Sequence, residues 1–280
     1  MLRDYLSLLK PRIVVLLVGT AVAPMIPAAR GLPRGSEVLA VIVGGTLAAG
    51  GAHAVNSWLD RDIDAVMKRT RRRPIPAGRI PAWHALVLGV VLNLVAFAVL
   101  ATWTNLLAAL LALTGTLIYV FVYTLWLKRW TSQNIVIGGA AGAIPPLVGW
   151  AAVTGRLDLT ALSLFLVIFC WTPPHFWALA QMISRDYERA NIPMMPVVAG
   201  QGTTKRQSLA YALLTVVLSL VPFFTGAEGA VYLAAALMLG AGLVTLAALD
   251  LTARGWTRRL YGYSSLYLAA LFVMLAVGAL

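Results

Sequence analysis

Nine apolar runs, most of them about 20 residues long, constrain the fold of this 280-residue chain more than any other feature. A helix of about 20 apolar residues crosses the hydrocarbon core of a bilayer. Backbone groups in lipid need partners within their own segment, and the alternating pattern of a membrane barrel is absent. We predict an all-α polytopic membrane protein with nine transmembrane helices. The predicted spans are 13–29, 38–58, 82–102, 106–127, 135–153, 160–182, 208–226, 229–249 and 262–280.

The composition excludes a soluble domain. Only 11% of the residues are charged and 60% are hydrophobic, whereas soluble domains carry about 25% charged residues. No long polar stretch divides the chain, which favours a single membrane domain over residues 1–280. The one cysteine, Cys170, excludes an intrachain disulfide and a cysteine-cluster metal site.

The basic residues indicate how the chain lies in the membrane. With the N-terminus in the cytoplasm, 19 of the 22 Lys and Arg residues lie in cytoplasmic segments, including Arg254 before the ninth span. Such a bias is typical of multi-pass proteins. We therefore expect a protein of the cell inner (cytoplasmic) membrane with its N-terminus in the cytoplasm. The basic loops that orient the chain in the membrane explain its high pI. We therefore expect no nucleic acid partner.

Polar residues form an acidic stripe at the cytoplasmic end of the second span. Asn56, Asp60 and Asp64 are four residues apart and so share one helix face. His53 lies on the same stripe, one turn deeper in the membrane. Carboxylate and amide oxygens suit Mg²⁺, which proteins commonly hold with one or two carboxylates plus substrate phosphates. At the end of a span these carboxylates are expected near the surface.

Five cations follow the acids in the run 68–74, KRTRRRP. Metal-binding carboxylates beside Lys and Arg are what a diphosphate site requires. A solvated loop that sets topology is the alternative interpretation of the same charges. That alternative does not explain the amide of Asn56 within the apolar span.

A second group of candidate residues follows the sixth span. Pro173 and Pro174 remove backbone donors and predict an interrupted helix. His175 follows them within the membrane, where a polar residue indicates function, although a buried core histidine is the alternative. Asp186 opens the next polar loop. Lys128 and Arg129 supply cations between the fourth and fifth spans.

These motifs resemble the UbiA superfamily of intramembrane prenyltransferases. Asn56-x₃-Asp60-x₃-Asp64 with its basic run is similar to the first motif of that superfamily. The blocks 123–129 (YTLWLKR) and 171–179 (WTPPHFWAL) are similar to its protohaem IX farnesyltransferase (haem O synthase) branch. An Asp-x₃-Asp motif found after the sixth span in other members is absent here, which leaves the second metal position open.

The resemblance implies nine helices around a central cavity that cytoplasmic loops cap. It implies transfer of a farnesyl group from farnesyl diphosphate to a vinyl group of haem b, with addition of water, giving haem O and diphosphate. It further implies Mg²⁺ as cofactor, the lipid bilayer as surroundings, and a haem A synthase that would use the product.

Each candidate residue then has an expected role. The expected metal ligands are Asn56, Asp60, Asp64 and Asp186. The expected diphosphate contacts are Arg12, Lys68, Arg72, Lys128 and Arg129. The expected haem contacts are His175 and Trp177. The expected catalytic residues are Asp60, Asp64, Lys128 and His175.

Three other functions compete with this interpretation. A prenyltransferase for quinones or other aromatic acceptors would share the acidic stripe. A secondary transporter would require matched broken spans in two halves and a midplane site, whereas the acids here lie at one membrane face. A non-catalytic haem-binding assembly factor would need His175 but not the Asn56, Asp60 and Asp64 stripe.

Overall fold

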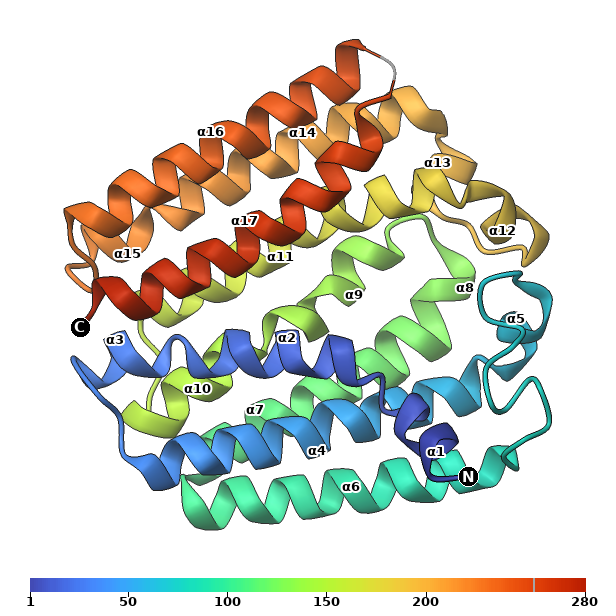
Figure 1. Ribbon diagram of the computed structural model, residues 1–280, viewed down its shortest axis with the longest axis horizontal. Helices are drawn as coiled ribbons and strands as arrows, with labels where there is room; N and C mark the ends of the chain where they lie inside the picture. Colours follow the sequence, from blue (N-terminus) through green and yellow to red (C-terminus); the bar gives the residue numbers. More distant parts are fainter. Residues whose placement is uncertain (254) are drawn as a thin grey trace.

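The computed structural model describes residues 1–253 and 255–280, and over those residues it contains helices and turns but no strand (Figure 1). Nine segments in this part of the chain are long and apolar enough to cross a bilayer, which confirms the predicted fold. Their bounds are Pro11–Ala29 (α2, α3), Gly35–Leu59 (α4), Ala82–Trp103 (α6), Leu106–Trp130 (α7 to α8), Asn134–Thr154 (α9, α10), Leu159–Met182 (α11), Gly200–Phe224 (α14, α15), Ala230–Thr252 (α16) and Thr257–Gly278 (α17).

Short helices flank these spans and subdivide some of them. Those outside the spans are α1 (Leu2–Leu8), α5 (Arg61–Val66), α12 (Ser184–Arg189) and α13 (Met195–Val198). Within the spans lie α2 (Pro11–Val22), α3 (Met25–Ala29), α7 (Leu106–Leu117), the π-helical segment η1 (Ile118–Leu127), α8 (Lys128–Trp130), α9 (Asn134–Ala143), α10 (Pro145–Thr154), α14 (Gly200–Ser219) and α15 (Val221–Phe224).

Two spans begin five or more residues earlier than the sequence predicted. The seventh starts at Gly200 rather than residue 208, and the ninth starts at Thr257 rather than residue 262. Hydropathy detects the apolar part of a helix, whereas the helix itself continues through polar turns beyond it. In α14 this extension is stabilised because Lys205 pairs with the buried Asp250 of α16 at 3.2 Å.

The two proline pairs behave differently. Pro145 begins α10 and divides the fifth span, because proline is readily accommodated in the first turn of a helix. The predicted interruption at Pro173 and Pro174 is wrong, since α11 continues through both residues. Proline within a membrane helix is tolerated where side chains and neighbouring helices satisfy the freed backbone groups. Next to this pair, the Thr172 hydroxyl donates to the Ile168 carbonyl at 2.8 Å.

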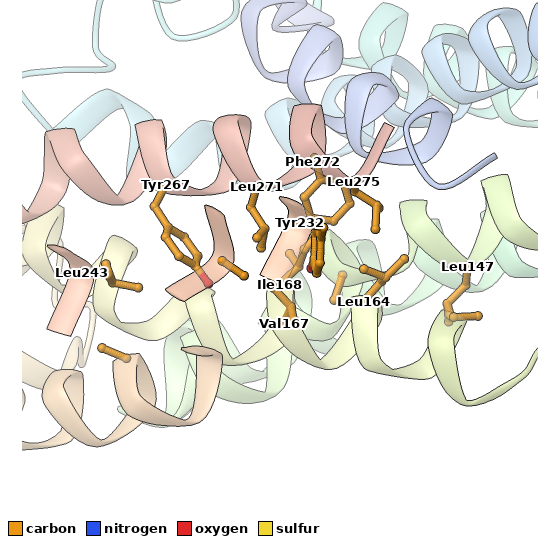
Figure 2. Packing of buried hydrophobic residues seen from close by; sticks show 14 of the residues in the cluster. Leu147, Leu164, Val167, Ile168, Tyr232, Leu243, Tyr267, Leu271, Phe272 and Leu275 are labelled. Atoms are coloured by element: carbon orange, nitrogen blue, oxygen red, sulfur yellow. The ribbon is translucent and has the colours of Figure 1, made fainter. Parts of the chain in front are cut away.

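The largest apolar core joins the last helices to α11. Figure 2 shows Tyr267 and Leu271 of α17 in the same cluster as Val167 and Ile168 of α11. The fully buried Tyr232 of α16 completes this contact and donates its hydroxyl to the Ser219 carbonyl at 2.8 Å. This core lies mainly among α11, α14, α16 and α17. A cavity lies in another part of the bundle, between α2, α4 and α9.

The predicted cytoplasmic segments gather at one end of the bundle. Figure 1 shows α1, α5, α8, α12 and α13 at that end, together with the end of α16 and the start of α17. Arg254, which belongs to this connection, lies outside the described residues. The opposite end carries α3, α15 and the C-terminus. The segregation of basic loops that the sequence predicted is therefore present in the fold.

Two loops at this end pack on each other and cover it. Ile63 and Met67, from the connection after α4, share one buried cluster with Tyr187, Ile192 and Met194 of the connection after α11. These side chains are at most 6% exposed. The contact brings the acidic stripe and the loop that carries Asp186 to the same end of the protein.

Candidate active site

The acidic stripe is buried, although its position at the end of a span predicted exposure. Asn56, Asp60 and Asp64 are each 3% exposed. α4 ends at Leu59 and α5 begins at Arg61, yet the Asp64 amide donates to the Asp60 carbonyl at 2.8 Å. The helical path therefore continues far enough to keep the three side chains together. Buried carboxylates require partners, and these come from distant parts of the chain.

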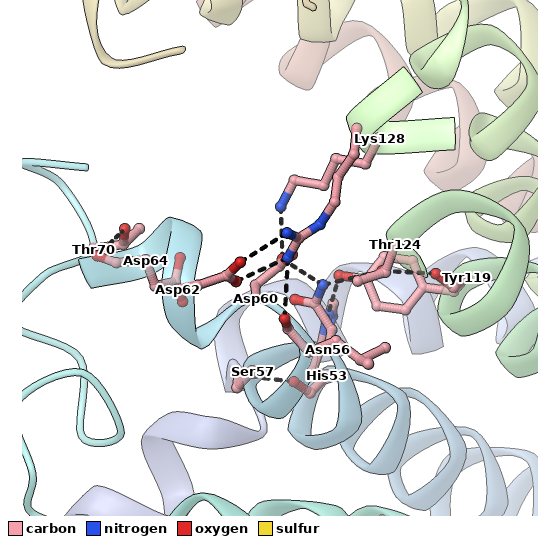
Figure 3. Close-up of polar contacts among 12 residues, drawn as sticks. His53, Asn56, Ser57, Asp60, Asp62, Asp64, Thr70, Tyr119, Thr124 and Lys128 are labelled. Carbon is pink, nitrogen blue, oxygen red and sulfur yellow. Dashed lines mark hydrogen bonds and ion pairs between the residues drawn. The ribbon is translucent and has the colours of Figure 1, made fainter. Parts of the chain in front are cut away.

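A cation accompanies each member of the stripe, and Figure 3 shows the one beside Asp60, Lys128. Lys128 Nζ lies 2.6 Å from Asp60 Oδ2, and Asn56 Nδ2 donates to the same oxygen at 2.7 Å. Arg73 lies 2.7 Å from Asp64 Oδ2. Lys10 donates to the Asn56 side-chain oxygen at 2.8 Å. Acids and bases therefore lie side by side, as the basic run beside the stripe predicted, and Lys10 and Lys128 add cations from other parts of the chain.

Lys10 joins this network from a strained position. It precedes Pro11 of α2 with a φ of 52°, in the left-handed region that a non-glycine residue adopts only when its surroundings hold it there. Burial, followed by the nearby Arg73 guanidinium, lowers the pKa of Lys10 to about 7. An amine with such a pKa gains protons readily when an anion arrives beside it.

The π-helical segment η1 forms another wall of the site. Its wider turn lets the Thr124 hydroxyl donate to the Tyr119 carbonyl at 2.8 Å, five residues back. The same hydroxyl oxygen accepts a hydrogen bond from Asn56 Nδ2 at 3.1 Å. π-Helical turns frequently mark functional sites. Here the turn fixes the amide orientation so that the Asn56 oxygen faces Lys10.

The stripe has the chemistry of a magnesium site. Asn56, Asp60 and Asp64 offer only oxygen ligands. Asp60 Oδ1 is buried without a hydrogen-bond partner among the described residues, so one oxygen is available to a cation. No group of three or more His, Cys, Asp or Glu side chains gathers in residues 1–253 and 255–280, so the three predicted carboxylate ligands Asp60, Asp64 and Asp186 do not form one cluster.

Asp186 lies in α12, within the connection that covers the site, and pairs with Arg189 of the same helix at 3.7 Å. The next residue, the buried Tyr187, is affected by the charges of both Asp186 and Asp60. Burial raises the pKa of Tyr187 to about 12, and the carboxylates of Asp186 and Asp60 act in the same direction. Asp186 is thus near the stripe, but no hydrogen bond or ion pair joins it to Asp60 or Asp64.

The predicted diphosphate contacts divide into three groups. Lys128 is in the network, whereas Arg129 forms two hydrogen bonds to Asp62, at 2.7 and 2.8 Å. This guanidinium holds the pKa of Asp62 at about 2. The remaining predicted contacts are exposed at the same end of the protein without a bond to the stripe: Arg12, Lys68 and Arg72.

An apolar cavity of about 300 Å³ lies one helical turn deeper than the stripe: His53 lines it, but Asn56, Asp60 and Asp64 do not. Its walls come from α2, α4, α7, η1, α9, α10 and α11. Small residues on two facing helices leave the space open: Gly45, Ala48, Ala49 and Ala52 of α4, and Gly138, Gly139, Ala141 and Gly142 of α9. His53, Tyr119 and Tyr123 line it near the stripe. A charged stripe next to an apolar cavity suits an amphiphile with an anionic head.

The two predicted haem contacts do not line this cavity. His175 bonds through Nδ1 to Ser264 Oγ at 2.8 Å and stacks between Trp171 and Tyr261, with ring centroids 4.3 and 4.8 Å away. Trp177 is fully buried in the cluster that joins the two covering loops. From α11, Thr172 and Phe176 reach the cavity instead. The roles predicted for His175 and Trp177 stay predictions.

Several residues of the site were not predicted. Lys10 and Arg73 pair with the stripe, and Thr124 orients its amide. Arg73 is the last cation of the basic run, and Lys10 directly precedes a span. Both residues are charges at a membrane boundary, and this feature could have identified them as site residues from the sequence. No local pattern singles out Thr124, because its contact depends on the π-helical turn.

Comparison with known proteins agrees with this geometry. Residues 16–258 match the UbiA prenyltransferase family. The chain belongs to this family. The match covers the acidic stripe, the cavity walls and the covering loops.

Relatives in the family are similar over nearly the whole chain. A protoheme IX farnesyltransferase of Symbiobacterium thermophilum is 54% identical, over 97% of this chain and 92% of its own length. One of Gloeobacter violaceus is 52% identical, over 100% and 92% respectively. One of Roseiflexus sp. (strain RS-1) is 54% identical over 99% of this chain, which spans 52%, about half, of that protein.

Solved structures share the fold at low sequence identity. A digeranylgeranylglyceryl phosphate synthase superposes with a TM-score of 0.83 at 17% identity, covering 99% of this chain and 98% of that one. A UbiA homologue from Archaeoglobus fulgidus, solved with DMAPP and Mg²⁺, gives 0.69 at 16% identity, covering 98% and 99%. Both support the helical architecture described above.

Proposed function

We propose that the protein transfers a farnesyl group from farnesyl diphosphate to a vinyl group of haem b, with addition of water, to give haem O and diphosphate. The observation that carries the proposal is the buried acid–base network at the end of an apolar cavity. The names of relatives about 50% identical support haem b as the acceptor. We propose that residues 1–280 act as one membrane domain.

The network stabilises the leaving group. Asn56, Asp60 and Asp64 would hold Mg²⁺, which neutralises diphosphate oxygens, and the Archaeoglobus homologue with Mg²⁺ supports this assignment. Lys128, Arg73 and Lys10 already lie within 3 Å of the stripe, so little reorganisation is needed when a diphosphate enters. Preorganised charge of this kind is usually the largest catalytic term. We propose that the exposed Arg12, Lys68 and Arg72 attract the anion.

The cavity protects the cation that follows. Ionisation breaks the allylic C–O bond, and diphosphate leaves with the electron pair. The terminal vinyl carbon of haem then attacks farnesyl C1, and the cationic carbon next to the porphyrin binds water and loses a proton. Tyr119 and Tyr123, stacked with ring centroids 5.8 Å apart, line the cavity where they can stabilise positive charge.

The test is a defined reaction. Purified protein with haem b, farnesyl diphosphate and Mg²⁺ is expected to form a pigment whose mass equals haem b plus a farnesyl group plus a hydroxyl group. EDTA is expected to stop the reaction, and added Mg²⁺ to restore it, because the stripe offers oxygen ligands only. Mass spectrometry of the extracted pigment is the measurement. Farnesylation of a quinone precursor but not of haem b would contradict the proposed acceptor and favour an aromatic prenyltransferase.

We propose that the end of the bundle carrying the stripe faces the cytoplasm, that the chain resides in the inner membrane, and that a haem A synthase uses the product. Single cysteines at Ser36 and Arg71 are expected to react with a membrane-impermeant maleimide from opposite sides. Both positions are exposed at opposite ends of the protein, and Cys170 is buried. Mass-tagging in sealed vesicles is the measurement. Labelling of both positions from one side would contradict the topology.

A further inference from the structure

One polar atom in the cavity wall has no role in the mechanism described so far. His53 lies on α4, one turn deeper than Asn56, and is 7% exposed. Its Nδ1 lies 3.2 Å from the Tyr119 hydroxyl (Figure 3). Its Nε2 is buried and has no hydrogen-bond partner among the described residues. Of the residues lining the cavity, His53 is the one with such an atom.

An unpartnered ring nitrogen at this depth is costly. Burying a polar group without a partner costs about 1–3 kcal/mol, so each such group in a folded protein requires an explanation. Two threonine hydroxyls of the wall have partners. Thr116 donates to Asn93 at 2.7 Å, and Thr172 donates to the Ile168 carbonyl at 2.8 Å. His53 Nε2 is therefore a buried nitrogen without a partner, on a residue that lines an apolar cavity.

The hydrogen bond on the other nitrogen indicates which ligand fits. When Nδ1 donates its hydrogen to Tyr119, the lone pair is on Nε2, on the buried side of the ring. A neutral imidazole whose second nitrogen is hydrogen-bonded is the usual form of a histidine that binds a metal. Histidine is also the commonest protein ligand of haem iron. Small residues on α4 and α9 leave room beside the ring for a flat molecule.

We propose that His53 Nε2 is the axial ligand of the haem iron in the acceptor, and that Tyr119 positions the ring. This inference rests on the proposed function and names the contact that holds its acceptor. His53 and Asp60 are seven residues apart, or roughly 10 Å along a helix. With its iron bound at His53, haem would present the edge of its porphyrin ring, rather than its centre, to the farnesyl carbon whose C–O bond breaks beside Asp60. His175, engaged by Ser264 and two aromatic rings, stabilises the contact between α11 and α17.

The experiment is a titration of the purified full-length protein with ferric haem b, followed by absorption and electron paramagnetic resonance spectroscopy. The wild type is expected to give a spectrum of histidine-ligated iron. His53→Ala is expected to lose it and to raise the Kd for haem by about tenfold or more, because a coordinate bond exceeds a neutral hydrogen bond. Added imidazole is expected to restore the ligated spectrum in His53→Ala, which a purely structural role would not produce.

Two further arms make the result decisive. Metal-free protoporphyrin IX is expected to bind the wild type and His53→Ala with equal affinity, since it has no iron to ligate. His175→Ala and His84→Ala, the other two histidine variants, are expected to keep the ligated spectrum. An unchanged haem spectrum and Kd in His53→Ala would overturn the proposal, as would loss of ligation in His175→Ala. A wild type that ligates haem but does not farnesylate it would instead contradict the proposed function.

Discussion

Asp60→Asn is expected to lower turnover by a factor of about 10²–10³, the usual effect of removing one preorganised charge from a transition state. Asp60 combines the two features that such a group needs. Its Oδ2 is fixed by Lys128 and Asn56 at 2.6 and 2.7 Å, and its buried Oδ1 is free for a cation. The measurement is kcat for haem farnesylation at saturating Mg²⁺.

The same change is expected to destabilise the protein. The Lys128 and Asp60 side chains are 12% and 4% exposed, so Asp60→Asn leaves a buried ammonium without its counter-charge. Breaking such a pair costs about 3–5 kcal/mol. Adding Lys128→Met removes the unpaired charge. We therefore expect the Asp60→Asn, Lys128→Met protein to regain much of its thermal stability and to remain inactive.

A matched control is Asp4→Asn. Asp4 pairs with Arg79 at 3.0 Å at the same end of the protein, but both side chains are partly exposed and outside the stripe. Exposed pairs contribute about 0–1 kcal/mol, so this variant should keep its stability and turnover. Wild-type turnover in Asp60→Asn would exclude a catalytic role for the carboxylate. Recovery of turnover in the double variant would show that the loss came from instability alone.

Gly149→Ala is expected to lower the free energy of unfolding by about 3 kcal/mol, the upper end of the range for overpacking. Gly149 lies where α10 crosses α2. A Cβ there would overlap the Ala21 carbonyl oxygen and lie 2.8 Å from its carbonyl carbon. These are backbone atoms, so the helices have to separate. Because Ala21 and Val148 line the cavity, we expect activity to fall as well.

Gly142→Ala is the matched control for this substitution. Gly142 is in the same membrane span, but a Cβ there meets nothing within 4 Å. Alanine favours a helix over glycine by about 1 kcal/mol, so this variant should unfold at an equal or higher temperature than the wild type. Thermal unfolding in detergent, followed by circular dichroism, measures both. Equal losses in the two variants would contradict the close approach of α10 and α2.

Local properties of the sequence determined the fold class and the position of the acids. Hydropathy over windows of about 20 residues is enough to identify nine spans, because the backbone hydrogen bonds of each span are made within that span. The spacing of Asn56, Asp60 and Asp64 predicted one shared face, and the structure keeps them together. The charge distribution among loops predicted which segments gather at one end of the bundle.

Only the tertiary structure decided what surrounds those acids. Lys10 reaches Asn56 from 46 residues away, and Lys128 reaches Asp60 from 68, distances over which sequence spacing carries no geometric information. Helix packing also decided which histidine lines the cavity. His175 has the more prominent motif, yet α11 directs it to α17, whereas α4 directs the less conspicuous His53 into the cavity. A side chain's environment depends on which helices meet its face, and that is a property of the assembled bundle.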